Sequence, residues 1–192
     1  MIKPVARFVK VRRKRAIISL VFLGLLLLIF LGGGGYHGLF SPVDVTSDAT
    51  GSYTVIGMER TGTYRKNHAF RETNILHGIH ALGLGETVGL PVSITYDRYD
   101  KVKNDQKRSF VGYLLAAEAE IELPERSALS IQAFNITGGL QVKTSAHRAI
   151  GGFNASRRLK KELNRQDEDL SVAVLEIYNP AGEVTFIAPV TE

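Results

Sequence analysis

A glutamate stands inside an otherwise apolar segment near the end of the chain. Residues 170–180 read L-S-V-A-V-L-E-I-Y-N-P, which predicts a β-strand that ends at a turn through Asn179 and Pro180. Side chains alternate between the two faces of a strand, so Glu176 and Tyr178 share one face and the other face is wholly apolar. Both faces are therefore predicted to be covered. A buried carboxylate needs an internal partner, a proton, or a cavity whose ligand supplies the opposite charge.

Other side chains that could do chemistry give weaker signals. His77 and His80 are three residues apart in one helical pattern, but no third ligand has a matching local spacing, so we predict no metal site. No Ser-His-Asp arrangement stands out, and the sequence contains no cysteine, which excludes a thiolate metal site and a cysteine nucleophile. The glycines at 32–35 lack the lysine of a phosphate-binding loop. We therefore predict no catalytic group, no metal and no cofactor.

The net charge of +5 comes from one end of the chain. Seven of the 24 basic residues lie within residues 1–15, where there is no acidic residue, and the 17 that remain are set against 19 acidic residues. The rest of the chain is thus slightly acidic. Its composition gives no indication of a nucleic-acid partner.

An apolar run follows the basic segment. Residues 16–36 contain no charged side chain and are long enough to cross a bilayer as a helix. The basic flank would stay in the cytoplasm, which places the C-terminal domain outside it, in the periplasm if the source is bacterial. A cleaved signal peptide is the alternative, and the length of the run favours a retained signal anchor. The sequence therefore predicts a single-pass membrane protein: a cytoplasmic segment 1–15, a transmembrane anchor 16–36, a linker 37–50 and a globular domain 51–192.

Two similar successions of elements make up the predicted domain. Apolar periodicity, turn residues and capping residues give the following order. The elements are a strand at 53–58, a helix at 65–82, strands at 92–96 and 110–117, strand-like segments at 131–136 and 140–149 around a Gly138-Gly139 turn, a helix at 156–166, and strands at 170–180 and 184–188. We interpret this order as a pseudo-symmetric duplication in an α+β domain. The place where two such halves meet is a common site for a small-molecule cleft.

Three short motifs resemble those of the GyrI-like (gyrase-inhibitor-like) effector-binding domain, and the resemblance covers roughly residues 51–192. The first is Gly62-Thr63-Tyr64, after the first strand. The second is Tyr96-Asp97 followed by Arg108 to Gly112, although the family often has a proline shortly after the aspartate, where this chain has Arg98-Tyr99. The third and most specific is Glu176-Ile177-Tyr178-Asn179-Pro180. The N-terminal anchor resembles a single-span, membrane-anchored subgroup of this family.

The resemblance implies a duplicated β-α-β-β fold of the GyrI-like/SHS2 type, with an antiparallel sheet and two helices, here preceded by one transmembrane helix. It also implies a cleft in which a glutamate meets cationic, lipophilic ligands, and Glu176 is the matching position. Tyr64, Tyr96 and Tyr178 would then line the cleft and add cation–π attraction and phenol hydrogen bonds. In the alternative interpretation, Glu176 pairs with an arginine such as Arg108 or Arg148 and the tyrosines are ordinary core residues.

Two classes of function remain open. The first is a membrane-tethered, non-catalytic domain that binds or senses a small amphiphilic, lipophilic or cationic ligand and that has a membrane-protein partner to receive the signal. The second is a hydrolase in which Glu176 assists the attack of water, as in some GyrI-like proteins. No second catalytic group stands out, so the binding domain is favoured. A scaffold for another membrane protein is a third possibility.

Overall fold

The computed structural model divides the chain into two compact units, Met1–Phe40 and Ser41–Glu192. It describes residues 19–32, 41–97, 101–116, 119, 121–146, 148–165 and 173–190. The predicted cytoplasmic segment 1–15 lies outside these residues, as do both ends of the predicted anchor.

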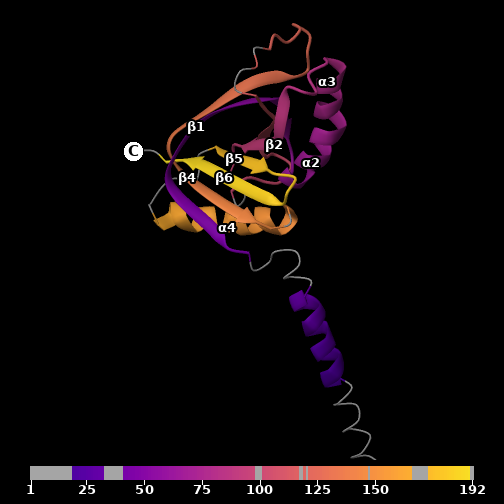
Figure 1. Cartoon of the computed structure of the whole chain (residues 1–192), viewed down its shortest axis with the longest axis vertical. Helices are drawn as coiled ribbons and strands as arrows, with labels where there is room; N and C mark the ends of the chain where they lie inside the picture. The colour runs from indigo at the N-terminus through magenta and orange to yellow at the C-terminus, as the bar shows by residue number, and fades with distance from the viewer. Residues whose placement is uncertain are drawn as a thin grey trace, which may run out of the picture. The chain divides into compact units, whose positions relative to one another are not determined.

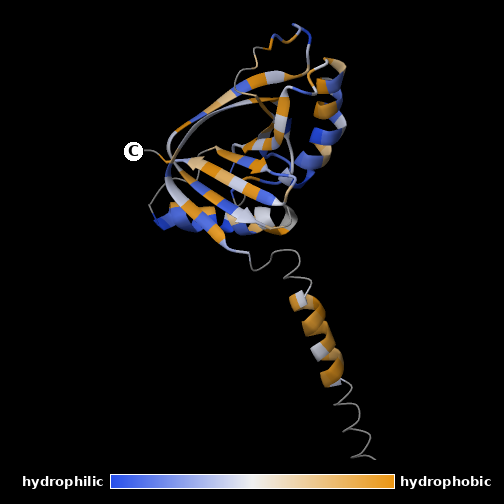
Figure 2. Cartoon of the chain, in the orientation of Figure 1, coloured by the Kyte–Doolittle hydropathy of each residue, from blue (hydrophilic) through white to orange (hydrophobic). Residues whose placement is uncertain are grey.

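The first unit contains one described helix, at residues 19–32, whose side chains are exposed and mostly hydrophobic (Figure 2). Within the described ranges, no helix has the length and apolar character needed to span a membrane. The predicted single-pass arrangement, with its anchor at 16–36 and its outward-facing domain, is therefore contradicted.

The second unit is an α+β domain with six strands (Figure 1). Its elements are β1 (Val43–Thr61), the 3₁₀-helix η1 (Tyr64–Lys66), α2 (Asn67–Phe70), the π-helix η2 (Arg71–Ile75), α3 (Leu76–Ala81), β2 (Val88–Thr95), β3 (Arg108–Leu115), β4 (Ser130–Ser145), α4 (Arg148–Arg165), β5 (Val174–Tyr178) and β6 (Glu183–Pro189). Strand, helix, strand, strand thus occurs twice, and the predicted order is confirmed. The predicted single helix at 65–82 is instead the run from η1 to α3, which a π-helical turn interrupts.

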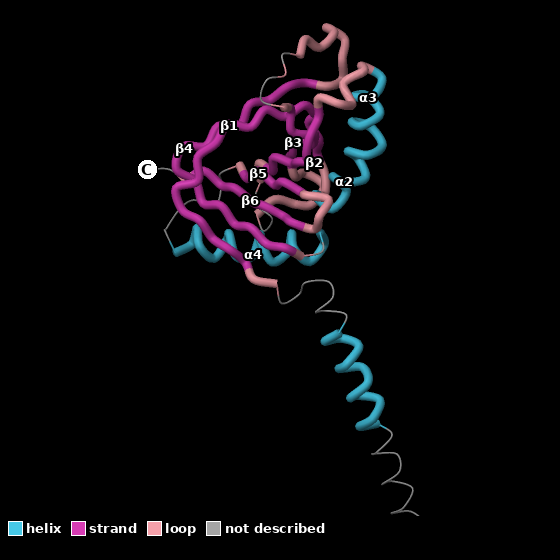
Figure 3. The backbone as a smooth tube through the Cα atoms, in the orientation of Figure 1, coloured by secondary structure: helices cyan, strands magenta, loops and turns pink. Residues whose placement is uncertain are grey.

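The six strands form a closed antiparallel barrel in the order β1-β3-β2-β5-β6-β4. Each half contributes its own three strands, and the halves join at two places, where β2 pairs with β5 and where β1 pairs with β4. The helices lie outside the barrel (Figure 3). The antiparallel sheet was predicted, whereas its closure into a barrel was not.

Three predicted boundaries differ from the structure. The segments at 131–136 and 140–149 are one continuous strand, β4, because Gly138 adopts a φ of 73° and produces an irregularity within the strand instead of a reversal of the chain. Strand β1 begins at Val43, inside the predicted linker 37–50, because residues 43–46 pair with β4. The predicted helix at 156–166 begins earlier, at Arg148.

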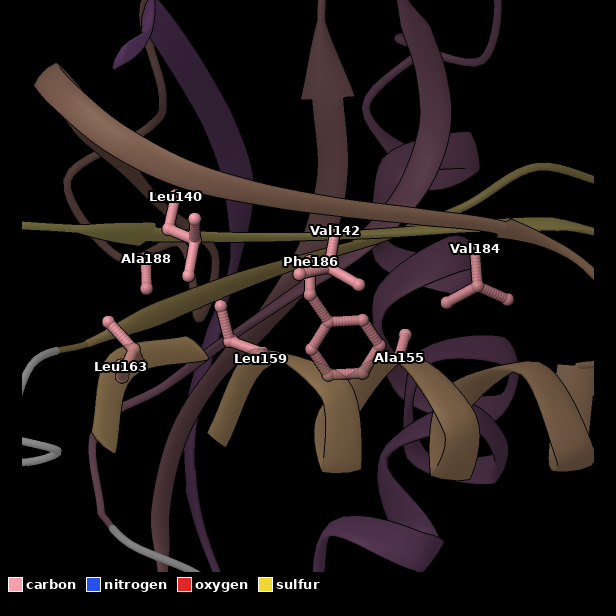
Figure 4. Packing of buried hydrophobic residues seen from close by; sticks show 8 residues of the cluster. All are labelled: Leu140, Val142, Ala155, Leu159, Leu163, Val184, Phe186 and Ala188. Carbon is pink, nitrogen blue, oxygen red and sulfur yellow. The ribbon is translucent and has the colours of Figure 1, made fainter. Parts of the chain in front are cut away.

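Alternation along the strands produces three separate hydrophobic clusters. The interior of the barrel holds Val55, Val92, Ile94, Phe110, Ile136, Leu175 and Ile187. A second cluster lies between η2, α3 and the outer face of strands β1 and β3: Ile56, Ile75, Ile79, Val111, Tyr113, Leu115 and Leu129. The third cluster lies between α4 and strands β4 and β6, and Figure 4 shows its helix residues pointing at the strands: Leu140, Val142, Ala155, Leu159, Leu163, Val184, Phe186 and Ala188. Each helical layer is therefore anchored independently to the barrel.

Strands β1 and β3 approach each other most closely where two glycines pair. Gly57 lies opposite Gly112. A Cβ atom added at Gly112 would lie 2.1 Å from the carbonyl oxygen of Ile56, and one at Gly57 would lie 2.1 Å from that of Val111. A glycine inside a strand is typical of such a close approach of two backbones.

We predict that Gly112→Ala destabilises the domain by at least about 2 kcal/mol, because the new methyl group meets backbone that can move only if the barrel distorts. Urea unfolding followed by circular dichroism measures the change. Gly152→Ala is the control, because a Cβ atom there meets nothing within 4 Å. It should leave stability unchanged or raise it by up to about 1 kcal/mol through helix propensity. Equal stability of the two variants would contradict the prediction.

Candidate functional site

A cleft of about 980 Å³ opens on the outside of the barrel, where residues of both helical layers and of strands β2 and β5 come together. The first layer contributes residues of η1, α2 and η2, and the second contributes residues between 152 and 160 of α4. The lining consists of Tyr64, Arg65, Asn67, His68, Arg71, Ser93, Gly152, Phe153, Ser156, Arg157, Lys160, Glu176 and Tyr178. The cleft therefore lies where the two halves of the domain meet, as the duplication predicted.

The strand pairing between the halves provides the floor of this cleft. Ser93 of β2 is directly opposite Glu176 of β5, so both side chains project from the same face, opposite to the interior residue Leu175. Glu176 is 2% exposed and Ser93 is 1% exposed. The Tyr178 hydroxyl donates a hydrogen bond of 2.5 Å to Glu176 Oε2, and the Thr95 hydroxyl lies 3.5 Å from Oε1. The carboxylate is thus held in position by hydroxyl groups of its own strand and of the neighbouring strand.

Ser93 is a buried polar group that other described residues do not satisfy. Its Oγ atom has no hydrogen-bond partner within the described part of the chain, and its residue lines the cleft. A buried hydroxyl without a partner costs about 1–3 kcal/mol. A ligand group in the cleft that accepts or donates a hydrogen bond at Ser93 would recover this energy.

Arg71, like Ser93, is a residue of the cleft that sequence analysis did not single out. It is 1% exposed, and its Nη1 atom donates a hydrogen bond of 2.8 Å to the Val92 carbonyl oxygen. Its guanidinium carbon lies 5.8 Å from the centre of the Tyr113 ring and 5.7 Å from that of Tyr178, distances typical of cation–π contacts. The sequence did contain a signal, because Arg71 lies four residues before the buried Ile75 on the apolar stripe of the helix, where a charge is unusual.

Arg71 is also the first residue of the π-helical turn. Single π-turns inside helices are rare and are frequent at functional sites. Upstream of it, Arg60 Nη1 donates a hydrogen bond of 2.6 Å to Asn67 Oδ1, and Asn67 Nδ2 donates one of 3.3 Å to Ser109 Oγ. This network fixes the start of the helical layer against strands β1 and β3.

The motifs that carried the family resemblance meet at one end of the cleft. The Tyr64 hydroxyl lies 2.9 Å from the Asp97 carbonyl oxygen and 3.2 Å from that of Arg108, and it accepts a hydrogen bond from the Asp97 amide at 3.1 Å. Burial raises the pKa of Tyr64 to about 12, so the hydroxyl is neutral at pH 7. The alternative interpretation paired Glu176 with Arg108 or Arg148. Arg108 Nη2 instead lies 2.9 Å from Asp97 Oδ1, and the side chain of Arg148 lies outside the described residues.

Three of the four predicted ligand-binding residues line the cleft and one does not. Glu176, Tyr178 and Tyr64 belong to the lining. Tyr96 packs against the cluster inside the barrel, and its hydroxyl donates a hydrogen bond of 2.7 Å to Gln132 Oε1. Successive side chains of a strand point to opposite faces, so Tyr96 lies on the same face as Val92 and Ile94, inside the barrel. Ser93 and Thr95 project from the opposite face, toward the cleft.

No family model matches this sequence, and no curated protein is similar to it in sequence. Solved structures do share its fold. EcmrR, in its complex with DNA, superposes with a TM-score of 0.55 at 10% identity over 95% of this chain and 70% of EcmrR. A hydrolase from Listeria innocua gives a TM-score of 0.48 at 9% identity, over 78% of this chain and 91% of the hydrolase. SAV2435 bound to tetraphenylphosphonium gives a TM-score of 0.43 at 9% identity, over 78% of this chain and 94% of SAV2435.

These neighbours have a GyrI-like fold, and the likeness to EcmrR supports that fold for this chain. At such low identity it shows the fold alone. The resemblance that the three motifs carried is thus supported for architecture, whereas the membrane-anchored subgroup finds no support, because no helix among the described residues is long and apolar enough to span a membrane.

We predict that the ion pair beneath Tyr64 contributes stability at neutral pH that is lost in acid. Hydrogen bonds from Arg108 hold the pKa of the Asp97 carboxyl below its ordinary value of 3.8. A depressed folded-state pKa stabilises the protein above the unfolded-state value, and this contribution disappears as the pH falls through the folded-state value. Asp97→Asn should therefore be less stable than the wild type in urea unfolding at pH 7, and the difference should shrink by pH 3.

Asp105→Asn is the matched control, because Asp105 is exposed in the same loop and should give a small difference at both pH values. A stability difference for Asp97→Asn that stays constant from pH 7 to pH 3 would show that the carboxylate charge has no part in it.

Proposed function

We propose that this chain binds a small amphiphilic molecule in the cleft between its two helical layers, as a ligand-binding domain and not as an enzyme. The volume of about 980 Å³ lies at the upper end of the range of about 300–1,000 Å³ that is usual for small-molecule sites. The lining combines three aromatic side chains, one helical glycine and nine polar or charged residues, so it is more polar than most such sites.

The observation that carries the proposal is the floor formed by Ser93 and Glu176. Both side chains are almost fully buried, both line the cleft, and the Ser93 hydroxyl has no hydrogen-bond partner among the described residues. Buried polar groups in folded proteins are almost always satisfied. The Ser93 hydroxyl lies at the bottom of a cleft, so a polar group of a bound ligand is the simplest hydrogen-bond partner for it.

We further propose that the domain acts as a GyrI-like effector-binding domain. The residues of its three motifs surround the same cleft: Tyr64 and Tyr178 line it, and Asp97 and Arg108 hold the Tyr64 hydroxyl. A binding domain of this kind has no output of its own. It therefore needs a partner protein that responds to the occupied cleft.

A probe that fluoresces in apolar surroundings, the neutral amine N-phenyl-1-naphthylamine, tests the proposal on the full-length protein. The wild type should give saturable fluorescence. Gly152→Leu should lose most of it, because residue 152 lines the cleft and its Cβ direction is open, so the leucine side chain would occupy the ligand's space. Gly152→Ala is the matched control, with similar helix propensity and too small a side chain to fill the cleft, and it should bind as the wild type does.

The variant pair also separates the cleft from the exposed apolar helix at residues 19–32, which remains identical in all three proteins. Equal probe binding by Gly152→Leu and Gly152→Ala would contradict the proposal, because the probe would then be bound elsewhere.

A further inference from the structure

The residues that line the cleft are ordered by depth. Among the described residues of the lining, those that are no more than 4% exposed are all polar: Asn67, Arg71, Ser93 and Glu176. We call these four residues the buried end of the cleft. The aromatic side chains lie nearer the solvent, since Tyr64 and Tyr178 are half-buried and Phe153 is exposed. The cleft is therefore polar at its buried end and offers aromatic surface farther out.

The fold itself engages three of the four residues at the buried end. Arg71 donates a hydrogen bond to the backbone of β2, Glu176 accepts one from the Tyr178 hydroxyl, and Asn67 belongs to the network at the start of the helical layer. Ser93 differs from them, because its Oγ atom has no hydrogen-bond partner within the described ranges. A serine hydroxyl both donates and accepts hydrogen bonds. A polar ligand group placed beside Ser93 can therefore pair with it in either direction.

The formal charges at the buried end cancel. Arg71 is cationic and Glu176 is anionic, whereas Asn67 and Ser93 are neutral. A charged ligand group would lose its hydration there without meeting a net opposite charge, and burying a charge costs far more than burying a hydroxyl or an amide that is hydrogen-bonded. The buried end therefore favours an uncharged polar group over a cation or an anion.

The outer part of the cleft suits the apolar body of a ligand. Phe153 is 66% exposed, an unusual environment for a phenylalanine. Beside it in sequence is Gly152, where an added Cβ atom would meet nothing within 4 Å. A hydrocarbon chain that lies over Gly152 and covers the Phe153 ring removes apolar surface from water, which is favourable.

From these observations we infer that the ligand is an uncharged amphiphile, such as a fatty alcohol or a fatty amide, that enters the cleft with its polar end first. Its hydroxyl or carboxamide group hydrogen-bonds to Ser93, and its apolar chain lies against the aromatic rings farther out. Ser93 is then the residue that determines specificity. This inference rests on the proposed function. It replaces the cationic ligand that the family resemblance implied, because Glu176 shares the buried end with Arg71.

The first test compares octan-1-ol, octanamide, octanoate and octylammonium as competitors of N-phenyl-1-naphthylamine on the full-length protein. The two uncharged compounds should displace the probe at concentrations at least about tenfold lower than the two ions do, because only the ions must bury a charge. Displacement by octanoate or octylammonium at an equal or lower concentration would overturn the inference and leave the proposed function standing. If no probe binding depends on residue 152, both are overturned.

The second test locates the polar group of the ligand. Ser93→Ala should weaken octan-1-ol about three- to tenfold, the net worth of one hydrogen bond, and should leave 1-fluorooctane, which has no hydroxyl, unchanged. Ser156→Ala is the matched control, because it removes the same hydroxyl from a less buried residue of the lining, and it should leave both compounds unchanged. Equal effects of the two variants on octan-1-ol would overturn the inference.

Urea unfolding of the ligand-free protein excludes a purely structural role for Ser93. Ser93→Ala should unfold at the same urea concentration as the wild type or at a higher one, because the substitution removes a buried hydroxyl that the described residues leave without a partner. A lower midpoint would overturn the inference, since it would show that the fold itself uses this hydroxyl.

Discussion

The pairing of β2 with β5 is the constraint on which the site depends. It joins the two halves of the domain on one side of the barrel and sets Ser93 directly opposite Glu176. Because side chains alternate along a strand, a shift of one residue in this register would turn Glu176 into the interior, among Val92 and Ile94. The apolar interior therefore enforces the register, since a carboxylate placed there would lose its hydroxyl partners and remain desolvated. Burial of apolar side chains in the barrel interior thus also places Ser93 and Glu176 on its outer face.

Duplication explains where the cleft lies, and the difference between the halves explains its chemistry. Both halves place a helical layer against the barrel, and the layers flank the β2–β5 junction (Figures 1 and 3). The first layer supplies Tyr64 and Arg71 to the cleft, whereas the second supplies Phe153, Arg157 and Lys160. The second layer also supplies Gly152, where a Cβ atom would meet nothing within 4 Å. This glycine leaves room for a ligand on the α4 side.

Local pattern was sufficient for part of the site. Alternation in residues 170–180 correctly predicted that Glu176 and Tyr178 share a face, and the same rule, applied to Tyr96, already placed it with Val92 and Ile94, away from the cleft. The buried Arg71 was harder to predict, because its surroundings come from strands distant in sequence. The continuity of β4 through Gly138 and the closure of the barrel depend likewise on long-range pairing. For residues 16–36, apolar composition predicted a membrane span, but within the described residues no helix is long and apolar enough to be one.

The central claim is that an amphiphile occupies the space between the helical layers, over the β2–β5 junction. Nuclear magnetic resonance of the ¹⁵N-labelled full-length protein during a titration with octan-1-ol tests it most directly, because each backbone amide reports on its own surroundings. The account predicts saturable shifts at Ser93, Gly152 and Tyr178, which belong to β2, α4 and β5 and all line the cleft. Shifts confined to the exposed apolar helix at residues 19–32, with these three amides unmoved, would contradict it.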